Sequence, residues 1–398
     1  MQSEIKTHST NSVQACQNCK KDFTIESEDF SFYEKIKVPP PTFCPECRHQ
    51  RRLCFRNERV FYKRNCDLCK KNVVSRVSPD KLYFTYCTKC WWSDNWDAKD
   101  YGMEVDFSRP FLEQWKELFL KVPHISLYSS NSINSDWVNQ ESDDKNCYLN
   151  VGGHYNEDSA YNTYQIYGKN CFDNYWILNS EYCSNNIHCE RGYFNHFSQE
   201  SHDCLNTSFS YDCRNCSNII GCAGLRNQKY CIFNNQHTKE SYEEFMKLHP
   251  LSSYLSLQWW KVESKKVWDN FPHRENTIFQ SVNSTGNCLL QAKNSHNCWE
   301  STKIENCKNL FIAGWSRETY DCSSMGASEL GYEIAHGGGT YNSKFLLFCF
   351  SADPLKKVSI HNVEYSVATS ASSNCFGCVG IRGGEYMILN KRYSKTEY

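Results

Sequence analysis

Between Asp203 and Cys222 the chain reads DCLNTSFSYDCRNCSNIIGC, and in this stretch Asn or Asp stands directly before Cys three times. Asn tolerates the left-handed backbone of a bend, and Cys is small enough for a narrow interior. A short β-run followed by such a bend, repeated at uneven intervals of roughly 20–24 residues, is typical of the turns of a parallel β-helix. An irregular antiparallel β fold is the alternative. Ten of the sixteen cysteines after residue 100 follow Asn or Asp, at Asn146-Cys147, Asn170-Cys171, Asp203-Cys204, Asp212-Cys213, Asn215-Cys216, Asn287-Cys288, Asn297-Cys298, Asn306-Cys307, Asp321-Cys322 and Asn374-Cys375.

A longer motif occurs twice. The stretch from Asn218 to Tyr242 matches the stretch from Asn374 to Tyr398 without gaps at a constant offset. We interpret the motif as the last turn of each of two related β modules, with glycines at bends, and we prefer this structural role to a duplicated ligand site. The matched pairs are Asn218/Asn374, Gly221/Gly377, Cys222/Cys378, Gly224/Gly380, Arg226/Arg382, Tyr230/Tyr386, Ile232/Ile388, Asn234/Asn390, Lys239/Lys395 and Tyr242/Tyr398.

The composition is that of a folded protein. The 398 residues carry a net charge of -1, 40% are hydrophobic and 15% are aromatic, which argues against wholesale disorder. Mean hydropathy is -0.68 and no apolar run approaches the length of a membrane span. The 25 cysteines are an odd number, and the N-terminus lacks the apolar stretch of a signal peptide. We therefore expect a cytoplasmic protein whose thiols bind metal or pack as small buried groups.

Four Cys-x-x-Cys pairs lie in the first hundred residues. Two such pairs supply the four thiolates of a tetrahedral site, which predicts two zinc ions. A site with four sulfur ligands has no open position for water, so both sites are expected to be structural. The sequential pairing is the simplest, and pairing across the two modules remains open. The predicted ligands are Cys16, Cys19, Cys44 and Cys47 for one site and Cys66, Cys69, Cys87 and Cys90 for the other. Cys54 is expected to be a core thiol.

A basic segment runs through the predicted zinc modules. Residues 1–100 hold 18 Lys and Arg against 13 Asp and Glu, and most of the excess lies in residues 48–76. Guanidinium groups bind phosphate oxygens, and nearby aromatic rings such as Phe55, Trp91 and Trp96 could stack on bases. The alternative is a basic face paired with the acidic β modules of the same chain. The predicted nucleic-acid contacts are Arg48, Arg51, Arg52, Arg56, Arg59, Lys63 and Arg64.

Two helices are expected outside the β modules. Ser108 is placed to cap the first, and Phe111, Trp115, Leu118 and Phe119 share one of its faces. Thr238 is placed to cap the second, which contains Tyr242, Phe245 and Met246. The predicted organisation is a polar tail (residues 1–15), two zinc-binding modules (16–100), a connector with a helix (101–130), a first β-helix module (131–236), a helix and linker (237–275) and a second β-helix module (276–398).

Catalytic signatures are weak. The downstream His and Cys residues His188, Cys189, His196, His202 and Cys204 have no recognised metal-ligand spacing. Acidic pairs such as Asp143-Asp144 and Glu157-Asp158 resemble ordinary surface acids, although a glycan-cleaving β-helix would need such groups. No catalytic residue and no small-molecule substrate is assigned, and an enzymatic role is not favoured.

The N-terminal motifs resemble a family. The segment FYEKIKVPPPTFCPECRHQRR (residues 32–52), followed by FRNER (55–59), SPDK (78–81) and WWSD (91–94), is similar to predicted zinc-ribbon proteins with Asn/Cys-rich repeats from ultrasmall uncultivated bacteria. The resemblance spans most of the chain. It implies zinc modules and a cytosolic setting, and it carries over no activity.

Together these patterns predict a mainly β, non-enzymatic zinc-binding protein. Its zinc-ribbon-like modules precede two parallel β-helix-like repeat modules. The leading hypothesis is that the basic zinc module contacts RNA or a ribonucleoprotein. The alternatives are a protein-assembly scaffold, with protein partners or self-association through the zinc modules, and a glycan-binding or glycan-cleaving β-helix.

Overall fold

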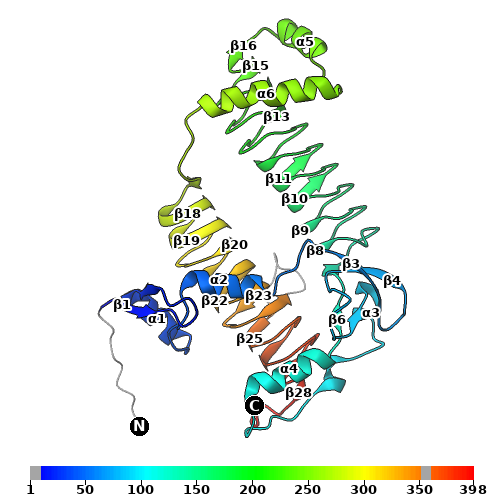
Figure 1. Cartoon of the computed structure of the whole chain (residues 1–398), viewed down its shortest axis with the longest axis vertical. Helices are drawn as coiled ribbons and strands as arrows, with labels where there is room; N and C mark the ends of the chain where they lie inside the picture. The colour runs from blue at the N-terminus through cyan, green and yellow to red at the C-terminus, as the bar shows by residue number, and fades with distance from the viewer. Residues whose placement is uncertain (1–9, 351–359) are drawn as a thin grey trace.

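The fold is mainly β, as predicted. The computed structural model describes residues 10–350 and 360–398. Two long stacks of short parallel strands carry N-terminal cysteine modules and a few covering helices (Figure 1). In the part of the chain that is described, no helix is long and apolar enough to cross a bilayer.

The first stack spans residues 129–232. Each strand pairs in parallel with the chain twelve residues further on, as in Thr163 with Tyr175 and Tyr175 with Ile187. Isolated bridges such as Tyr193 with Leu205 continue this register between β12 and β13. Its strands are β7 (Ser129–Ser130), β8 (Asn139–Ser142), β9 (Val151–His154), β10 (Thr163–Lys169), β11 (Tyr175–Glu181), β12 (Ile187–Glu190), β13 (Leu205–Ser208), β14 (Ser217–Ile220) and β15 (Lys229–Ile232).

Every third residue of this stack points inward. In one turn Cys171, Asn174, Ile177 and Ser180 are all buried, and the residue before each of Cys171, Asn174 and Ile177 has a positive φ. Asn170, at φ 51°, thus forms the bend that the Asn-Cys pattern predicts. The predicted spacing of roughly 20–24 residues was wrong, because the turn is twelve residues long. Inward positions are filled by Asn, Ser, Ile and Gly as well as Cys, so Cys marks only some turns.

Inward asparagines form a ladder along one side of the first stack. The Asn150, Asn162 and Asn174 side-chain oxygens each accept the backbone N–H of the residue twelve positions later, at 3.0 Å. These three side chains are at most 3% exposed. The ladder therefore satisfies one buried backbone N–H group in each of three successive turns and fixes their register.

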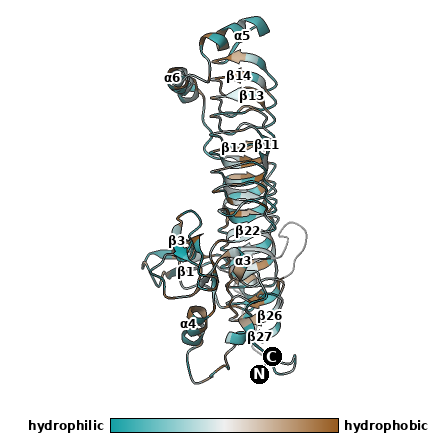
Figure 2. Cartoon of the chain, turned by 90° about the vertical axis from the view of Figure 1, so that its right-hand side faces the viewer, coloured by the Kyte–Doolittle hydropathy of each residue, from teal (hydrophilic) through white to brown (hydrophobic). Residues whose placement is uncertain are grey.

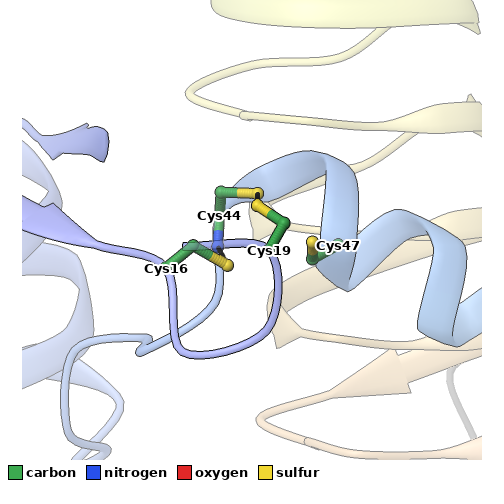
Figure 3. A group of neighbouring side chains, drawn as sticks. All are labelled: Cys16, Cys19, Cys44 and Cys47. Carbon is green, nitrogen blue, oxygen red and sulfur yellow. Dashed lines mark hydrogen bonds between the residues drawn. The ribbon is translucent and has the colours of Figure 1, made fainter. Parts of the chain in front are cut away.

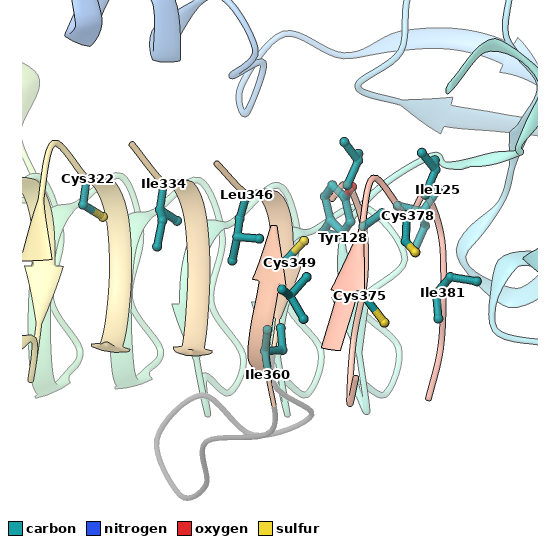
Figure 4. Packing of buried hydrophobic residues seen from close by; sticks show 14 of the residues in the cluster. Ile125, Tyr128, Cys322, Ile334, Leu346, Cys349, Ile360, Cys375, Cys378 and Ile381 are labelled. Atoms are coloured by element: carbon teal, nitrogen blue, oxygen red, sulfur yellow. The ribbon is translucent and has the colours of Figure 1, made fainter. Parts of the chain in front are cut away.

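The second stack spans residues 278–388 and also has parallel strands. The offset is mostly twelve residues, as in Phe311 with Ser323, and it is twenty between Thr340 and Ile360. Figure 4 shows Cys322, Ile334, Leu346, Cys349 and Cys375 pointing into its interior. Its strands are β17 (Ile278–Phe279), β18 (Val282–Leu290), β19 (Lys293–Thr302), β20 (Phe311–Gly314), β21 (Arg317–Tyr320), β22 (Ser323–Tyr332), β23 (Ala335–Tyr341), β24 (Leu347–Phe350), β25 (Ile360–Glu364), β26 (Ser373–Phe376) and β27 (Glu385–Ile388).

The duplicated motif closes both stacks. Each stack ends in an antiparallel hairpin, formed with β16 (Asn235–Gln236) or β28 (Lys391–Arg392). Asn234 accepts the N–H of Ala223, and Asn390 accepts that of Val379 in the same way. These equivalent bonds support the structural role proposed for the motif.

A helix covers each closed end. A Cβ on Gly224 would lie 2.0 Å from the ring of Phe271, and one on Gly377 would lie 2.8 Å from Phe111. Both glycines have positive φ, so they combine a bend with a close approach. The covering helices are α6 (Tyr254–Asn270), with α5 (Lys239–Leu248), at the first stack and α4 (Phe111–Lys121) at the second.

The helix predictions were partly correct. Thr238 caps α5 by accepting the N–H of Ser241, as predicted. The N-cap of α4 is Pro110, whereas the Ser108 hydroxyl bonds Asp106, so the predicted cap was wrong. Residues 250–275, predicted as a linker, contain the 17-residue helix α6, in which Trp260 is fully buried.

The two stacks lie side by side and run in opposite directions. Three contacts join them: the Arg214 guanidinium lies over the ring of Phe279, Nδ1 of His188 contacts the sulfur of Cys288, and the Tyr175 hydroxyl donates to Glu300. Along this series the residue number falls in the first stack and rises in the second. The junction is therefore lined by side chains from both stacks.

Two cysteine modules precede the stacks, and each begins with a β-hairpin and ends with a short helix. The first cysteine module comprises β1 (Ser12–Ala15), β2 (Asp22–Ile25), α1 (Ser27–Lys35) and α2 (Pro45–Leu53); the second comprises β3 (Tyr62–Asn65), β4 (Asn72–Ser75), β5 (Thr85–Tyr86) and α3 (Thr88–Trp91). The η1 turn (Ala98–Tyr101) and β6 (His124–Ile125) follow, and β6 pairs with β5. Figure 2 shows β1, β3, α4 and α6 on one common side of the stacks.

Candidate metal centres

The first centre joins a hairpin to a helix. Cys16 and Cys19 lie on the knuckle between β1 and β2, which closes at Lys20 with φ 65°. Cys44 is the N-cap of α2, and Cys47 lies in its first turn (Figure 3). The tight knuckle and the helix start thus each present two sulfur atoms to the same point.

The second centre repeats this construction. Cys66 and Cys69 lie on the knuckle between β3 and β4, which closes at Lys70 with φ 62°. Cys87 is the N-cap of α3, which contains Cys90. The pairing is therefore sequential in both modules, and the structure does not bring cysteines of different modules together.

The sulfur positions fit a tetrahedral metal ion. Within each centre the four Sγ atoms lie within 4.8 Å of one another. The Cys19–Cys44 and Cys69–Cys87 sulfur distances are 3.8 and 3.9 Å. A tetrahedron with metal–sulfur bonds of about 2.3 Å has an edge of about 3.8 Å. All 25 cysteines lie in the described residues and are free of disulfides.

Backbone N–H groups favour the ionised form of one thiol in each centre. Burial raises the pKa of Cys16, but hydrogen bonds from Cys44, Cys19 and Asn18 outweigh it and lower the pKa to about 6. The backbone N–H of Lys71 is the largest cause that lowers the pKa of Cys69, to about 7. Burial raises the pKa of Cys44, Cys87 and Cys90, so each centre has one thiol that ionises readily beside others that do not. A metal binds the thiolate form.

Two of the three arginines of α2 point into the protein. The Arg48 guanidinium donates to both oxygens of Asp321, at 2.9 and 3.1 Å. Arg52 lies 3.8 Å from the same carboxylate and donates to Ser323. The side chains of Arg48 and Arg52 are only 3% exposed. These two predicted nucleic-acid contacts are thus buried against the second stack.

The other predicted contacts are divided between paired and exposed positions. Arg51 pairs with Glu333, Arg56 with Glu58, and Arg64 with Asp67. Arg59 covers the ring of Tyr164 and remains exposed, as does Lys63. Among the rings expected to stack on bases, Trp91 and Trp96 are buried, whereas Phe55 is exposed. Cys54, predicted to be a core thiol, is exposed.

Apolar packing reinforces the attachment of the first cysteine module. The ring of Phe32 stacks on Tyr320 with centroids 3.8 Å apart, and Tyr33 meets Tyr332 edge to face. Lys308 donates to Asp29 at 2.9 Å. The sequence did not reveal these partners, because they lie on turns of the second stack almost 300 residues away.

The downstream His and Cys group is not one site. Cys189 and Cys204 point into the first stack and are buried, and His196 bonds Ser184. His188 and His202 instead lie at the junction of the stacks, near Glu200.

One of the two acidic pairs differs from the prediction of surface acids. Asp144 is 1% exposed, inside the first stack beside Glu141. Glu157 lies on the outer surface, between Lys145 and Lys169.

The chain matches no protein-family model and no curated protein sequence.

Proposed function

We propose that the chain is a non-enzymatic scaffold in which two zinc ions stabilise the N-terminal cysteine modules against a pair of parallel β-helices. We call the attachment of α2 to the second stack, through Arg48 and Arg52 beside Asp321, the clamp. The observation that carries this proposal is that the helix α2 supplies both cysteines of the first centre and arginines of the buried ion pair. Its first turn supplies Cys44 and Cys47, and the following turns insert Arg48 and Arg52 beside Asp321. A metal that fixes the start of α2 therefore also fixes the buried ion pair.

Zinc is the proposed ion because both donor sets consist of four thiolates. Such sets favour zinc or iron, and a closed tetrahedral site suits a structural zinc. When bound, zinc would supply cross-links between knuckle and helix and no chemistry. Cys16, Cys19, Cys44 and Cys47 would hold one ion, and Cys66, Cys69, Cys87 and Cys90 the other.

An aromatic face supports the scaffold role. Trp137, Tyr148, Tyr161 and Phe172 lie on neighbouring turns of the first stack and are between 41 and 51% exposed. Trp137 contacts Tyr148, and Tyr148 contacts Tyr161, with centroids 5.5 and 5.6 Å apart. Contiguous exposed apolar surface marks protein contact sites. Because helices cover the closed ends of the stacks, we place assembly contacts on this aromatic face.

Self-association is the assembly that the purified chain can test. Sedimentation velocity over a wide concentration range is expected to show association that Tyr148→Ser with Phe172→Ser weakens. Tyr167→Ser is the matched control, since Tyr167 is exposed on the same stack but outside the aromatic face. A strictly monomeric species at every concentration would contradict the assembly proposal. Binding to an oligosaccharide array, lost in the double variant, would favour the glycan alternative instead.

RNA binding is tested separately, by fluorescence anisotropy at several salt concentrations. Arg48 and Arg52 are occupied within the chain, so we expect no salt-dependent affinity from these two residues. A log–log salt slope of about -3 or steeper, flattened by Arg59→Ala with Lys63→Ala, would support the RNA hypothesis through these two exposed residues and would leave the buried pair of Arg48 with Asp321 unaffected.

A further inference from the structure

Three metal-binding side chains converge where the two stacks meet. The Nδ1 atom of His188 lies 3.0 Å from a carboxylate oxygen of Glu200 and 3.5 Å from the sulfur of Cys288. The three donor atoms lie within 4.8 Å of one another. His188 and Glu200 come from adjacent turns of the first stack, and Cys288 comes from the first turns of the second.

Cys288 is placed here by an irregularity of β18. The pairing of β18 with β19 shifts register between Ser284 and Gly286, where Gly286 has φ 138°. After this shift Cys288 takes the bend position, with φ 53°, and Leu289 is the buried residue that follows it. The other fifteen cysteines after residue 100, all of them in the described residues, are buried. A bulge that turns one side chain toward a neighbouring group is a recurrent device at functional sites.

Hydrogen bonding alone satisfies this cluster poorly. One nitrogen, Nδ1 of His188, faces both the Glu200 oxygen and the Cys288 sulfur, and a single N–H serves only one of them well. The Nε2 atoms of His188 and His202 are buried and have no hydrogen-bond partner among the described residues. A cation bound by Nδ1, the carboxylate and the thiolate would use all three lone pairs at once.

The surroundings supply the outer contacts that such a site needs. Nε2 of His188 lies 3.7 Å from Glu300, and that carboxylate accepts the hydroxyl of Tyr175 at 2.8 Å. Nε2 of His202 lies 3.9 Å from the second oxygen of Glu200. An outer carboxylate that faces the far nitrogen fixes the ring of a metal-binding histidine. Glu300 and His202 thus flank the two ligands from the first stack.

We propose that His188, Glu200 and Cys288 form a third metal site, which binds Zn²⁺ and links the two stacks. A nitrogen, a thiolate and a carboxylate suit zinc, whereas Ca²⁺ and Mg²⁺ prefer oxygen ligands. Three protein ligands leave a fourth position for water, unlike the two closed four-cysteine centres. The site also gives a role to Cys288, a cysteine that lies at a bend instead of in the interior of the stack.

The test counts zinc in the reduced, full-length protein after zinc loading and exhaustive desalting. The wild type is expected to hold one ion more per chain than Cys288→Ser. Cys54→Ser is the matched control, because Cys54 is exposed and outside every cluster. Equal zinc content in wild type and Cys288→Ser would overturn the proposal.

Cobalt provides a second measurement that does not depend on one variant. Protein whose four-cysteine centres are filled with zinc is titrated with Co²⁺ and read by its visible and sulfur-to-metal absorption. One equivalent of tetrahedral cobalt signal is expected in the wild type and none in His188→Gln, with unchanged circular dichroism. A wild type that gives no such signal would show that the cluster is only an ionic network.

Discussion

The guanidinium of Arg48 holds the carboxylate of Asp321 across 273 residues of sequence, with both oxygens accepting at 2.9 and 3.1 Å. Arg48 lies one residue after Cys47 of the first four-cysteine group, and Asp321 forms a bend on the second stack. The side chains are 3 and 0% exposed. The pair thus connects the first candidate metal centre to the second stack.

Removing one member of this pair is expected to destabilise the fold strongly. Asp321→Asn leaves both Arg48 and Arg52 without their carboxylate, so we expect a loss of about 3–5 kcal/mol in the free energy of unfolding. Arg48→Met is expected to cost less, because Asp321 keeps Arg52 at 3.8 Å. Denaturant titration measures both variants. Arg51→Ala, at the more exposed pair with Glu333, is the control and should cost no more than about 1 kcal/mol. An Asp321→Asn variant as stable as Arg51→Ala would contradict the assignment.

Glu141 is expected to make stability fall as pH rises. Burial, and then the neighbouring Asp144 charge, raise the pKa of Glu141 well above its ordinary value. The folded state therefore keeps a proton that the unfolded state releases, and folding is favoured most below the unfolded pKa near 4.3. Glu141→Gln should raise the unfolding midpoint at pH 7 and flatten the decline above pH 4.3.

Glu157 gives the opposite sign in the same stack. Lys145, followed by Lys169, lowers the pKa of Glu157, so its contribution is present above the unfolded pKa and is lost as pH falls through the folded value. Glu157→Gln should thus slightly lower the midpoint at pH 7. If both Gln variants shift the midpoint in the same direction, the assignment of Glu141 as a buried acid is wrong.

The covering helix α6 is expected to stabilise the closed end of the first stack. Trp260 is fully buried, its ring lies 5.3 Å from Phe233, and its indole N–H donates to His249. Trp260→Ala should cost about 3–5 kcal/mol, and hydrogen exchange should accelerate in β15. Val262→Ala, on the exposed side of the same helix, should stay within about 0.5 kcal/mol. Equal losses in the two variants would argue against the covering role.

The sequence predicted the local features well. Each Cys-x-x-Cys pair correctly indicates a knuckle or the start of a helix, and Thr238 correctly indicates a helix N-cap. These structures are determined by neighbouring residues. Asn before Cys correctly indicated a bend followed by an inward side chain at Asn170 and Cys171. Cys288 does not follow this rule, because the positive φ lies at Cys288 itself and the inward residue is Leu289.

Features that depend on distant partners were not predictable. The twelve-residue turn was hidden because Asn, Ser and Gly share the inward positions with Cys. The burial of Arg48 and Arg52 depends on Asp321, which no local pattern connects to α2. Helix α6 lies in residues that were predicted as a linker. Its apolar residues pack against side chains of the last turns of the first stack, and the sequence alone does not show this contact.

Hydrogen exchange with and without bound metal tests the clamp most directly. Metal removal, or Cys19→Ser to break the first centre alone, should accelerate exchange both in α2 and in β22, where Ser323 faces Arg52. Cys54→Ser should leave both segments unchanged. If α2 and β22 keep their protection after the first centre is broken, the metal does not hold the clamp, and the central claim is contradicted.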